Sequence, residues 1–355
     1  MEDEQKIKVG ITQGDVNGIG FEVILKTLAD QEVYENFTPI IYGSPKVAAY
    51  HRKALNIQNF SLNNIKAASE AHPKRVNIVT CGDDNAHVEL GKATQESGKA
   101  AFDALKLAVE DLKNGQIDVL VTAPINKKNI QSEEFSFPGH TEYLEQMAGE
   151  GKALMLLVAN SLRVGVVAGH VPIAQVSSYI SKELILEKLR ILNTSLKQDF
   201  TIRRPRIAVL GLNPHAGDNG LLGKEEQEII APAIEAANNE GIYAMGPYAA
   251  DGIFGSDALG KFDAILAMYH DQGLAPFKAL VFDSGVNYTA GLPFVRTSPD
   301  HGTAYDIAGQ DKANPDSFRA AIYLALDVYR SRKINKEIAS NPMQVRVKQE
   351  TERNA

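Results

Sequence analysis

Hydrophobic residues occur in short runs, and most of these runs are separated by stretches with helical spacing. The apolar runs predict strands at Ile7 to Thr12, Ile40 to Tyr42, Val119 to Thr122, Leu154 to Val158, Val164 to Ala168, Ile207 to Leu210 and Ala264 to Met268. Amphipathic spacing and capping residues predict helices at Phe21 to Leu28, Ala100 to Leu112, Ser181 (as the cap) to about Leu196, Glu225 to Ala237 and Asp316 to Arg330. This alternation predicts an α/β fold with a mostly parallel sheet.

Composition narrows the class of protein further. The chain has 355 residues, of which 44% are hydrophobic, and this length favours two domains, although no Pro/Ser-rich linker separates them. A net charge of −7 argues against a nucleic-acid binder with a broad basic face. The single cysteine, Cys81, excludes an internal disulfide and a thiolate metal site. Because no run approaches the roughly 18 apolar residues of a membrane span, we expect a soluble cytoplasmic protein. The residues beyond Arg330 are polar and charged, and we expect them to form a surface tail.

The first predicted strand runs into a glycine-rich turn, Gly14 to Gly20, before the first predicted helix. Free backbone amides at such a turn can bind an anion, but glycine is also required wherever a turn is sterically tight. The glycine spacing is not G-x-G-x-x-G, and the second strand ends in Tyr42-Gly43-Ser44 without an acidic residue. These features argue against a dinucleotide-binding turn here, while the anion site and the tight turn remain equal alternatives.

Three histidines each follow a predicted strand: His170, His215 and His270. The carboxyl ends of parallel strands share one edge of a sheet, so these side chains can converge. Three imidazoles with an open coordination position are typical of a catalytic divalent-metal site. Asp218 and Asp271 are near enough in sequence to orient the imidazoles, although each can equally cap a loop.

Other polar residues are candidates for binding an anion. Thr141 is a predicted helix N-cap, and with His140 it can receive a phosphate or carboxylate, or it can simply cap the helix. Lys278 and Arg296 lie in apolar, Gly/Pro-punctuated segments and suit an acidic phosphate; ordinary surface ion pairs are the alternative. The small, polar segment from Ser298 to Gly309 can wrap an adenosine group or serve only as a connection.

Within and after this segment, three motifs resemble the nicotinamide-cofactor loop of the isocitrate and isopropylmalate dehydrogenase superfamily. They are His301-Gly302-Thr303-Ala304, Asp306-Ile307-Ala308-Gly309 and Ala313-Asn314-Pro315. With Gly14 to Gly20, Pro138 to Thr141, Asn213 to Gly217 and Tyr269 to Gly273, they make the chain resemble the 4-hydroxythreonine-4-phosphate dehydrogenase family over roughly residues 7 to 330. The resemblance implies a two-lobed, three-layer α/β/α fold with its active site in the cleft between lobes 1–134 plus 290–355 and 135–289.

The resemblance also implies roles for individual residues. The divalent metal, zinc, magnesium or cobalt, would be bound by His170, His215 and His270. Substrate contacts would be His140, Thr141, Lys278, Asn287 and Arg296, and contacts to NAD or NADP would be His301, Gly302, Asp306 and Asn314. Candidates for the general base are Asp251, Asp271 and Lys278. Two positions depart from the family pattern: Asp218 stands where glutamate is expected, and Gln13 where proline often precedes the glycine.

The implied reaction is metal- and NAD(P)-dependent oxidation of 4-phosphohydroxy-L-threonine at its 3-hydroxyl, followed by decarboxylation to 3-amino-2-oxopropyl phosphate in vitamin B6 biosynthesis. Family members are homodimers whose two chains build each active site, so the third histidine would come from a second copy. Three alternatives stay open. They are a threonate or erythronate 4-phosphate dehydrogenase of sugar-acid catabolism, a phosphotransacetylase-like acyltransferase that needs no three-histidine site, and a metabolite sensor without turnover.

Overall fold

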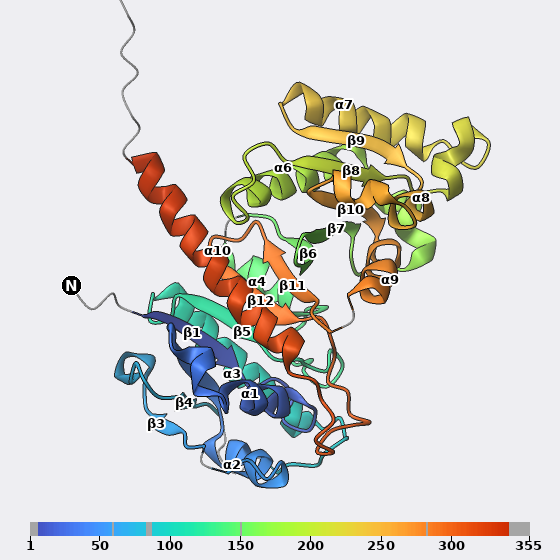
Figure 1. Ribbon diagram of the computed structural model, residues 1–355. Coiled ribbons are helices and arrows are strands. Elements are labelled where there is room, and N and C mark those ends of the chain that lie inside the picture. Colours follow the sequence, from blue (N-terminus) through green and yellow to red (C-terminus); the bar gives the residue numbers. More distant parts are fainter. Residues whose placement is uncertain (1–5, 59, 83–86, 150, 282, 341–355) are drawn as a thin grey trace, which may run out of the picture.

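The strands of the molecule form one continuous sheet, shown in Figure 1. The computed structural model describes residues 6–58, 60–82, 87–149, 151–281 and 283–340. Twelve strands lie side by side in the order β3 (Asn63–Ile65), β4 (Asn77–Thr80), β2 (Phe37–Gly43), β1 (Ile7–Thr12), β5 (Val119–Thr122), β12 (Val295–Pro299), β11 (Val286–Ala290), β6 (Leu154–Ala159), β7 (Leu162–Ala168), β10 (Ala264–Tyr269), β8 (Arg206–Leu210) and β9 (Tyr243–Tyr248). Helices pack on both faces of this sheet.

Most neighbouring strands are parallel, which confirms the predicted fold class. The exceptions lie at the centre, where β11 is antiparallel to β12 and to β6, and β6 is antiparallel to β7. The two halves of the sheet therefore run in opposite directions. The strands on the β12 side of the sheet come from residues 7–122 and 295–299, and those on the β11 side come from residues 154–290. We keep the predicted lobe boundaries as a proposal.

The longer helices are α1 (Gly20–Leu28), α2 (Pro45–Ala54), α3 (Gln95–Lys113), α4 (His140–Ala148), α6 (Lys182–Gln198), α7 (Ala231–Asn239), α9 (His270–Leu280) and α10 (Asp316–Ser340), and the shorter ones are α5 (Val176–Tyr179) and α8 (Ala250–Phe254). The side chain of Ser181 caps α6, as predicted. In the part of the chain that the structure describes, no helix combines the length and the apolar character needed to cross a bilayer.

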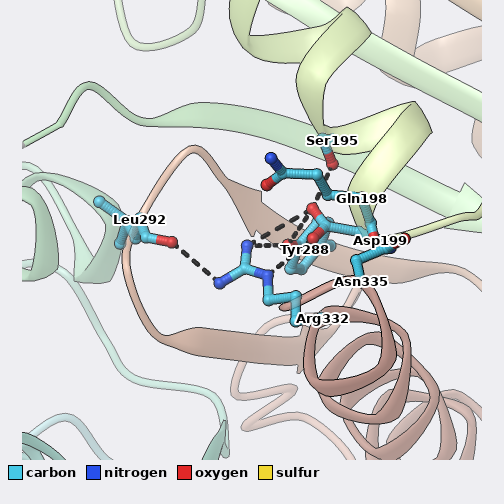
Figure 2. A network of polar contacts seen from close by, with 7 residues as sticks. All are labelled: Ser195, Gln198, Asp199, Tyr288, Leu292, Arg332 and Asn335. Atoms are coloured by element: carbon cyan, nitrogen blue, oxygen red, sulfur yellow. Dashed lines mark hydrogen bonds and ion pairs between the residues drawn. The ribbon is translucent and has the colours of Figure 1, made fainter. Parts of the chain in front are cut away.

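Helix α10 continues ten residues beyond the predicted end at Arg330, so the predicted end of this helix was wrong. The residues of this extension are mostly polar and exposed, in line with the predicted polar surface terminus, and the rest of that terminus, 341–355, lies outside the described residues. The polar network in Figure 2 gives the reason for the longer helix. Arg332 Nε donates to Asp199 Oδ1 at 2.7 Å, and Nη2 donates to the hydroxyl of Tyr288 at 2.8 Å. Asp199 is buried and also accepts hydrogen bonds from Ser195 and Tyr288. Because this buried carboxylate receives Arg332, the helix is tied to α6 and to β11.

Candidate active site

A polar cavity of about 270 Å³ lies where α4 and α9 begin and where the segments after β5, β7 and β12 meet. Its lining contains most of the predicted site residues, namely His140, Thr141, His170, His270, Lys278, Asn287, Arg296, His301 and Gly302. Both of the proposed lobe ranges contribute to this lining. The residues come from segments that are far apart in the sequence, so the sheet topology creates the cavity.

Arg296 on β12 is the most buried cation of the cavity, with 2% of its surface exposed. Its guanidinium donates hydrogen bonds only to hydroxyls, at Thr122 on β5 and Thr289 on β11. No carboxylate among the described residues forms an ion pair with it. Burial lowers the pKa of Arg296 to about 9, although the charge of Glu142 opposes this shift. A buried guanidinium without a carboxylate is suited to receive an anionic ligand.

The first turn of α4 forms another part of the cavity. The helix starts at His140 with Gly139 as its N-cap, so the prediction that Thr141 is the cap was wrong by two residues. Burial, together with the charges of Arg296 and Lys127, lowers the pKa of His140 well below its usual value, so this imidazole is neutral at pH 7. The amides of a helix start and a neutral imidazole together offer hydrogen-bond donors for an anion.

His170 and His270 follow the neighbouring strands β7 and β10, and their ring centroids lie 6.1 Å apart. Nδ1 of His170 is 2.9 Å from Glu142 Oε1, and Nδ1 of His270 is 2.6 Å from Asp271 Oδ1. A carboxylate on Nδ1 fixes the ring and leaves Nε2 as the ligating atom. The ammonium of Lys127 lies 2.9 Å from Nε2 of His170, so a cation already occupies this side of the imidazole.

The third predicted ligand, His215, does not line this cavity. It belongs to a left-handed turn, His215 to Asn219, which follows β8 and contacts α8, the helix that carries Asp251. Within the described residues of one chain, no three histidine, cysteine or carboxylate side chains form a metal cluster. No hydrogen bond in the described part joins Asp218 to His215. Instead, the buried carboxylate of Glu226 accepts hydrogen bonds from the backbone amides of Leu212 and Asn213, which precede the turn. One chain therefore brings two of the three imidazoles together.

The predicted cofactor residues are divided between two places. His301 and Gly302 line the cavity, whereas Asp306 and Asn314 are exposed outside it. The side chain of Asn314 accepts a hydrogen bond from the amide of Asp316 at 2.9 Å and so helps to start α10. Burial lowers the pKa of His301, which keeps its ring neutral at pH 7.

The glycine-rich turn anchors the segment 301–315 to the rest of the protein. Asp15 is fully buried and accepts hydrogen bonds from Tyr305, Ser97 and Asn129, so a side chain of the chain itself fills this turn. Gly14 has a φ of +68°, and a Cβ there would lie 2.4 Å from the carbonyl oxygen of Pro124. Of the two alternatives left open by the sequence, the structure supports the tight turn.

Sequence reasoning missed three charged residues of the cavity: Lys127, Glu142 and Asp300. Lys127 follows the end of β5 and Glu142 follows Thr141, so the rule that ligands bind at strand ends and helix starts points to both of them. Asp300 lies 3.1 Å from the ammonium of Lys278. Burial raises the pKa of Asp300, and the charge of Lys278 opposes this effect.

Several polar atoms of the cavity are buried without a hydrogen-bond partner in the described chain: His140 Nε2, Glu142 Oε2, Asn287 Oδ1 and His301 Nε2. A buried polar atom without a partner is costly, by about 1 to 3 kcal/mol. Their concentration in one cavity indicates that a polar ligand completes them.

The fold and the cavity define an α/β protein with a buried cation suited to an anionic ligand beside a pair of oriented imidazoles. The family described as pyridoxal phosphate biosynthetic protein PdxA matches residues 35–325. The chain belongs to this family, which confirms the resemblance seen in the sequence motifs.

Three relatives illustrate the similarity. A "4-hydroxythreonine-4-phosphate dehydrogenase" from Bacteroides thetaiotaomicron is 61% identical over 96% of this chain and 94% of its own length. The crystal structure of an enzyme with the same name from Klebsiella pneumoniae superposes with a TM-score of 0.79 at 34% identity, covering 92% of this chain and all of that one. A relative from Oceanobacillus iheyensis, provisionally named a D-threonate 4-phosphate dehydrogenase, is 39% identical over 90% of this chain and 97% of its own. These names place the family among the oxidoreductases.

Proposed function

We propose that this protein oxidises 4-phosphohydroxy-L-threonine at its 3-hydroxyl with NAD or NADP and a divalent metal. Decarboxylation of the resulting 3-oxo acid then gives 3-amino-2-oxopropyl phosphate, a step of vitamin B6 biosynthesis. The observation that carries the proposal is the buried cation Arg296, which has no carboxylate partner in the described chain and lies in the cavity with two oriented imidazoles. Relatives that match nearly the whole chain bear the name of this activity.

The cations and donors of the cavity are assigned to the substrate. Arg296 and Lys278 neutralise the phosphate, since a guanidinium binds phosphate through two hydrogen bonds and an ammonium acts as a point charge. His140 and Thr141, at the start of α4, add hydrogen bonds from a neutral ring and a hydroxyl. Asn287 offers a buried carbonyl oxygen that can accept a hydrogen bond from the substrate's amino group.

The donor set fits a divalent cation. His170 and His270 have their Nδ1 atoms engaged by carboxylates, which orients both Nε2 atoms for a metal; the ammonium of Lys127, now 2.9 Å from Nε2 of His170, would have to move away when the metal binds. We assign these two imidazoles to the metal and the third position to His215 of a second copy of the chain, in a homodimer. The bound cation, zinc, magnesium or cobalt, would supply Lewis acidity that lowers the pKa of the substrate hydroxyl and stabilises the charge developed during decarboxylation.

The remaining predicted residues concern the cofactor and the general base. His301 and Gly302 line the cavity and would hold the cofactor there, which when bound would supply the hydride acceptor; Asp306 and Asn314 lie further along the same segment. Among the candidates for the general base, Asp271 is engaged with His270, and Asp251 lies on α8 outside the cavity. Lys278 lines the cavity, but as an ammonium that binds the phosphate it has no lone pair to accept a proton, so we assign the general base to none of the three.

A second candidate is oxidation of threonate or erythronate 4-phosphate, which is favoured by the likeness to the provisional D-threonate 4-phosphate enzyme. The two substrates differ at carbon two, which carries an amino group in one and a hydroxyl in the other. The buried, unpartnered oxygens of Glu142 and Asn287 can only accept hydrogen bonds, and an ammonium group has three N–H donors where a hydroxyl has one O–H donor. The amino acid is therefore the preferred substrate.

A spectrophotometric comparison tests this proposal. Purified protein with a divalent metal and NAD or NADP is given either 4-phosphohydroxy-L-threonine or D-threonate 4-phosphate, and reduced cofactor is followed. We expect the larger kcat/KM for the amino acid. Turnover of threonate phosphate alone would assign the chain to the second candidate, and turnover of neither would overturn both.

A further inference from the structure

Five consecutive residues after β8, His215 to Asn219, have positive φ values between 41° and 78°. Four of them are not glycine, and residues with a Cβ adopt this conformation singly rather than in runs. Such a strained segment persists only where its surroundings fix it. The structure therefore contains contacts that hold this turn, and the turn carries His215.

The carboxylate of Glu226 provides these contacts. Glu226 has 3% of its surface exposed and begins a single π-helical turn, Glu226–Ile230. Its Oε1 accepts hydrogen bonds from the backbone amides of Leu212 and Asn213, both at 2.7 Å, and its Oε2 accepts one from the side-chain amide of Asn213 at 3.0 Å. These two residues lead directly into the left-handed turn.

The turn is also packed against the same carboxylate. A Cβ on Gly217 would lie 2.5 Å from Oε2 of Glu226, so the middle of the turn touches this side chain closely. Before the turn, the carbonyl oxygen of Gly211 accepts a hydrogen bond of 2.6 Å from the side chain of Gln272, two residues after His270. The segment that leads to His215 is therefore also hydrogen-bonded to the first turn of α9, where His270 lies.

We propose that Glu226 is a positioning residue for His215: it fixes the left-handed turn so that the imidazole is presented to a divalent cation. Both oxygens of Glu226 are occupied by the chain itself, so the carboxylate acts through the turn and not as a ligand. The inference rests on the proposed function, in which His215 ligates the metal of a second copy. It extends that function to a residue that contacts neither substrate nor metal.

The test is a titration with Co²⁺, whose visible absorption reports the ligand geometry, on the full-length protein. Glu226→Gln keeps an oxygen for the backbone amides but turns an NH₂ group toward the NH₂ group of Asn213. We expect Co²⁺ binding to weaken about tenfold or more, with a shifted absorption band. Glu228→Gln removes an exposed carboxylate from the same π-helical turn and is expected to change neither quantity.

The double variant separates positioning from a general loss of structure. When His215 is already replaced by Ala, Glu226→Gln should cause no further loss of Co²⁺ affinity. An equal loss in both backgrounds, or wild-type affinity in Glu226→Gln, would overturn the inference. If the wild type binds no Co²⁺, or if His215→Ala binds it as well as the wild type, the proposed metal site fails instead.

A second variant covers the case in which Glu226→Gln does not fold. Gly217→Ala leaves all charges unchanged, but its methyl group displaces the turn from Glu226. We expect the same loss of Co²⁺ affinity, again dependent on His215. Normal Co²⁺ binding by a folded Gly217→Ala variant would contradict the proposal.

Discussion

The guanidinium of Arg296 donates two hydrogen bonds to one atom, the hydroxyl oxygen of Thr122, at 3.1 Å from Nε and 2.7 Å from Nη2. A third goes to the hydroxyl of Thr289 at 3.1 Å. Hydroxyls orient a guanidinium but do not neutralise it, so the ligand-free protein holds a buried charge that a substrate phosphate would compensate. This relationship is the physical basis of the proposed substrate site.

Replacing Arg296 by Met should therefore separate activity from stability. We expect kcat/KM for 4-phosphohydroxy-L-threonine to fall about 100-fold or more, since two charge-assisted hydrogen bonds contribute about 1.5 to 3 kcal/mol each. The thermal midpoint should be unchanged or higher, because an uncompensated buried cation is removed. Arg190→Met, on the exposed face of α6 outside the cavity, is the control and should keep wild-type activity. A destabilised Arg296→Met variant with normal KM would contradict this assignment.

The affinity for inorganic phosphate should depend on the charge of Arg296. Burial lowers the pKa of this group to about 9, so it is charged at pH 7 and increasingly neutral above pH 9. Only the charged form attracts phosphate, and the thermal stabilisation by phosphate should be full at pH 7 to 8 and decline as the pH rises through 9. Because the folded state binds fewer protons than the unfolded state above this pKa, the ligand-free protein should gain stability from this group over the same range. A phosphate effect that is constant to pH 10, or retained in Arg296→Met, would exclude Arg296 as the receptor.

We expect the affinity of segment 301–315 for the cofactor to depend on the contact that fixes this segment to the turn between β1 and α1. The Tyr305 hydroxyl donates to Asp15 at 2.6 Å and also interacts with Asn126 and Thr303, so Tyr305→Phe removes these bonds, each worth about 1 kcal/mol. We expect KM for NAD or NADP to rise about fivefold with little change in kcat. Tyr329→Phe removes a similar bond to Asp118, which precedes β5 whereas the cavity lies after the end of this strand, and it serves as the matched control. Equal effects of both substitutions on cofactor KM would show that the anchor has no specific role.

If two copies share each site, inactive variants should complement one another. His215→Ala and His170→Ala chains are each expected to be inactive alone. In a mixed dimer, one active site contains both substitutions and the other contains neither. Random assembly on co-expression makes about half of the dimers mixed, so about a quarter of wild-type activity should be restored. An absence of restored activity in mixed dimers, verified by two different tags, would mean that each chain provides its own three ligands.

The apolar pattern predicted seven of the twelve strands that the structure describes; it missed β3, β4, β9, β11 and β12. β1 and β5 begin and end at the predicted residues, and β5 is fully buried, as expected for a continuous apolar run in a parallel sheet. His170 and His270 lie together for the reason given by the sequence, since each follows one of two neighbouring strands. This part of the site depends on local sequence and on a general rule of sheet topology.

The parts of the fold and of the site that the sequence did not predict depend on contacts between segments distant in the sequence. β11 and β12 are rich in polar residues, and the burial of Arg296 follows from pairing with β5 and not from its own neighbours in sequence. The extension of α10 required the contact of Arg332 with Asp199, 133 residues earlier. The conformation of the His215 turn required Glu226, which in sequence is an ordinary acidic residue of an amphipathic segment. No local pattern contains these relationships.

The stoichiometry of one reaction tests the central claim most directly. Purified protein with a divalent metal and excess NAD or NADP is given a limiting amount of 4-phosphohydroxy-L-threonine, and reduced cofactor and carbon dioxide are both measured. The account predicts one molecule of each per molecule of substrate, and an initial rate about 100-fold lower, or lower still, with Arg296→Met. Reduced cofactor without carbon dioxide, or a wild-type rate with the Arg296→Met variant, would contradict it.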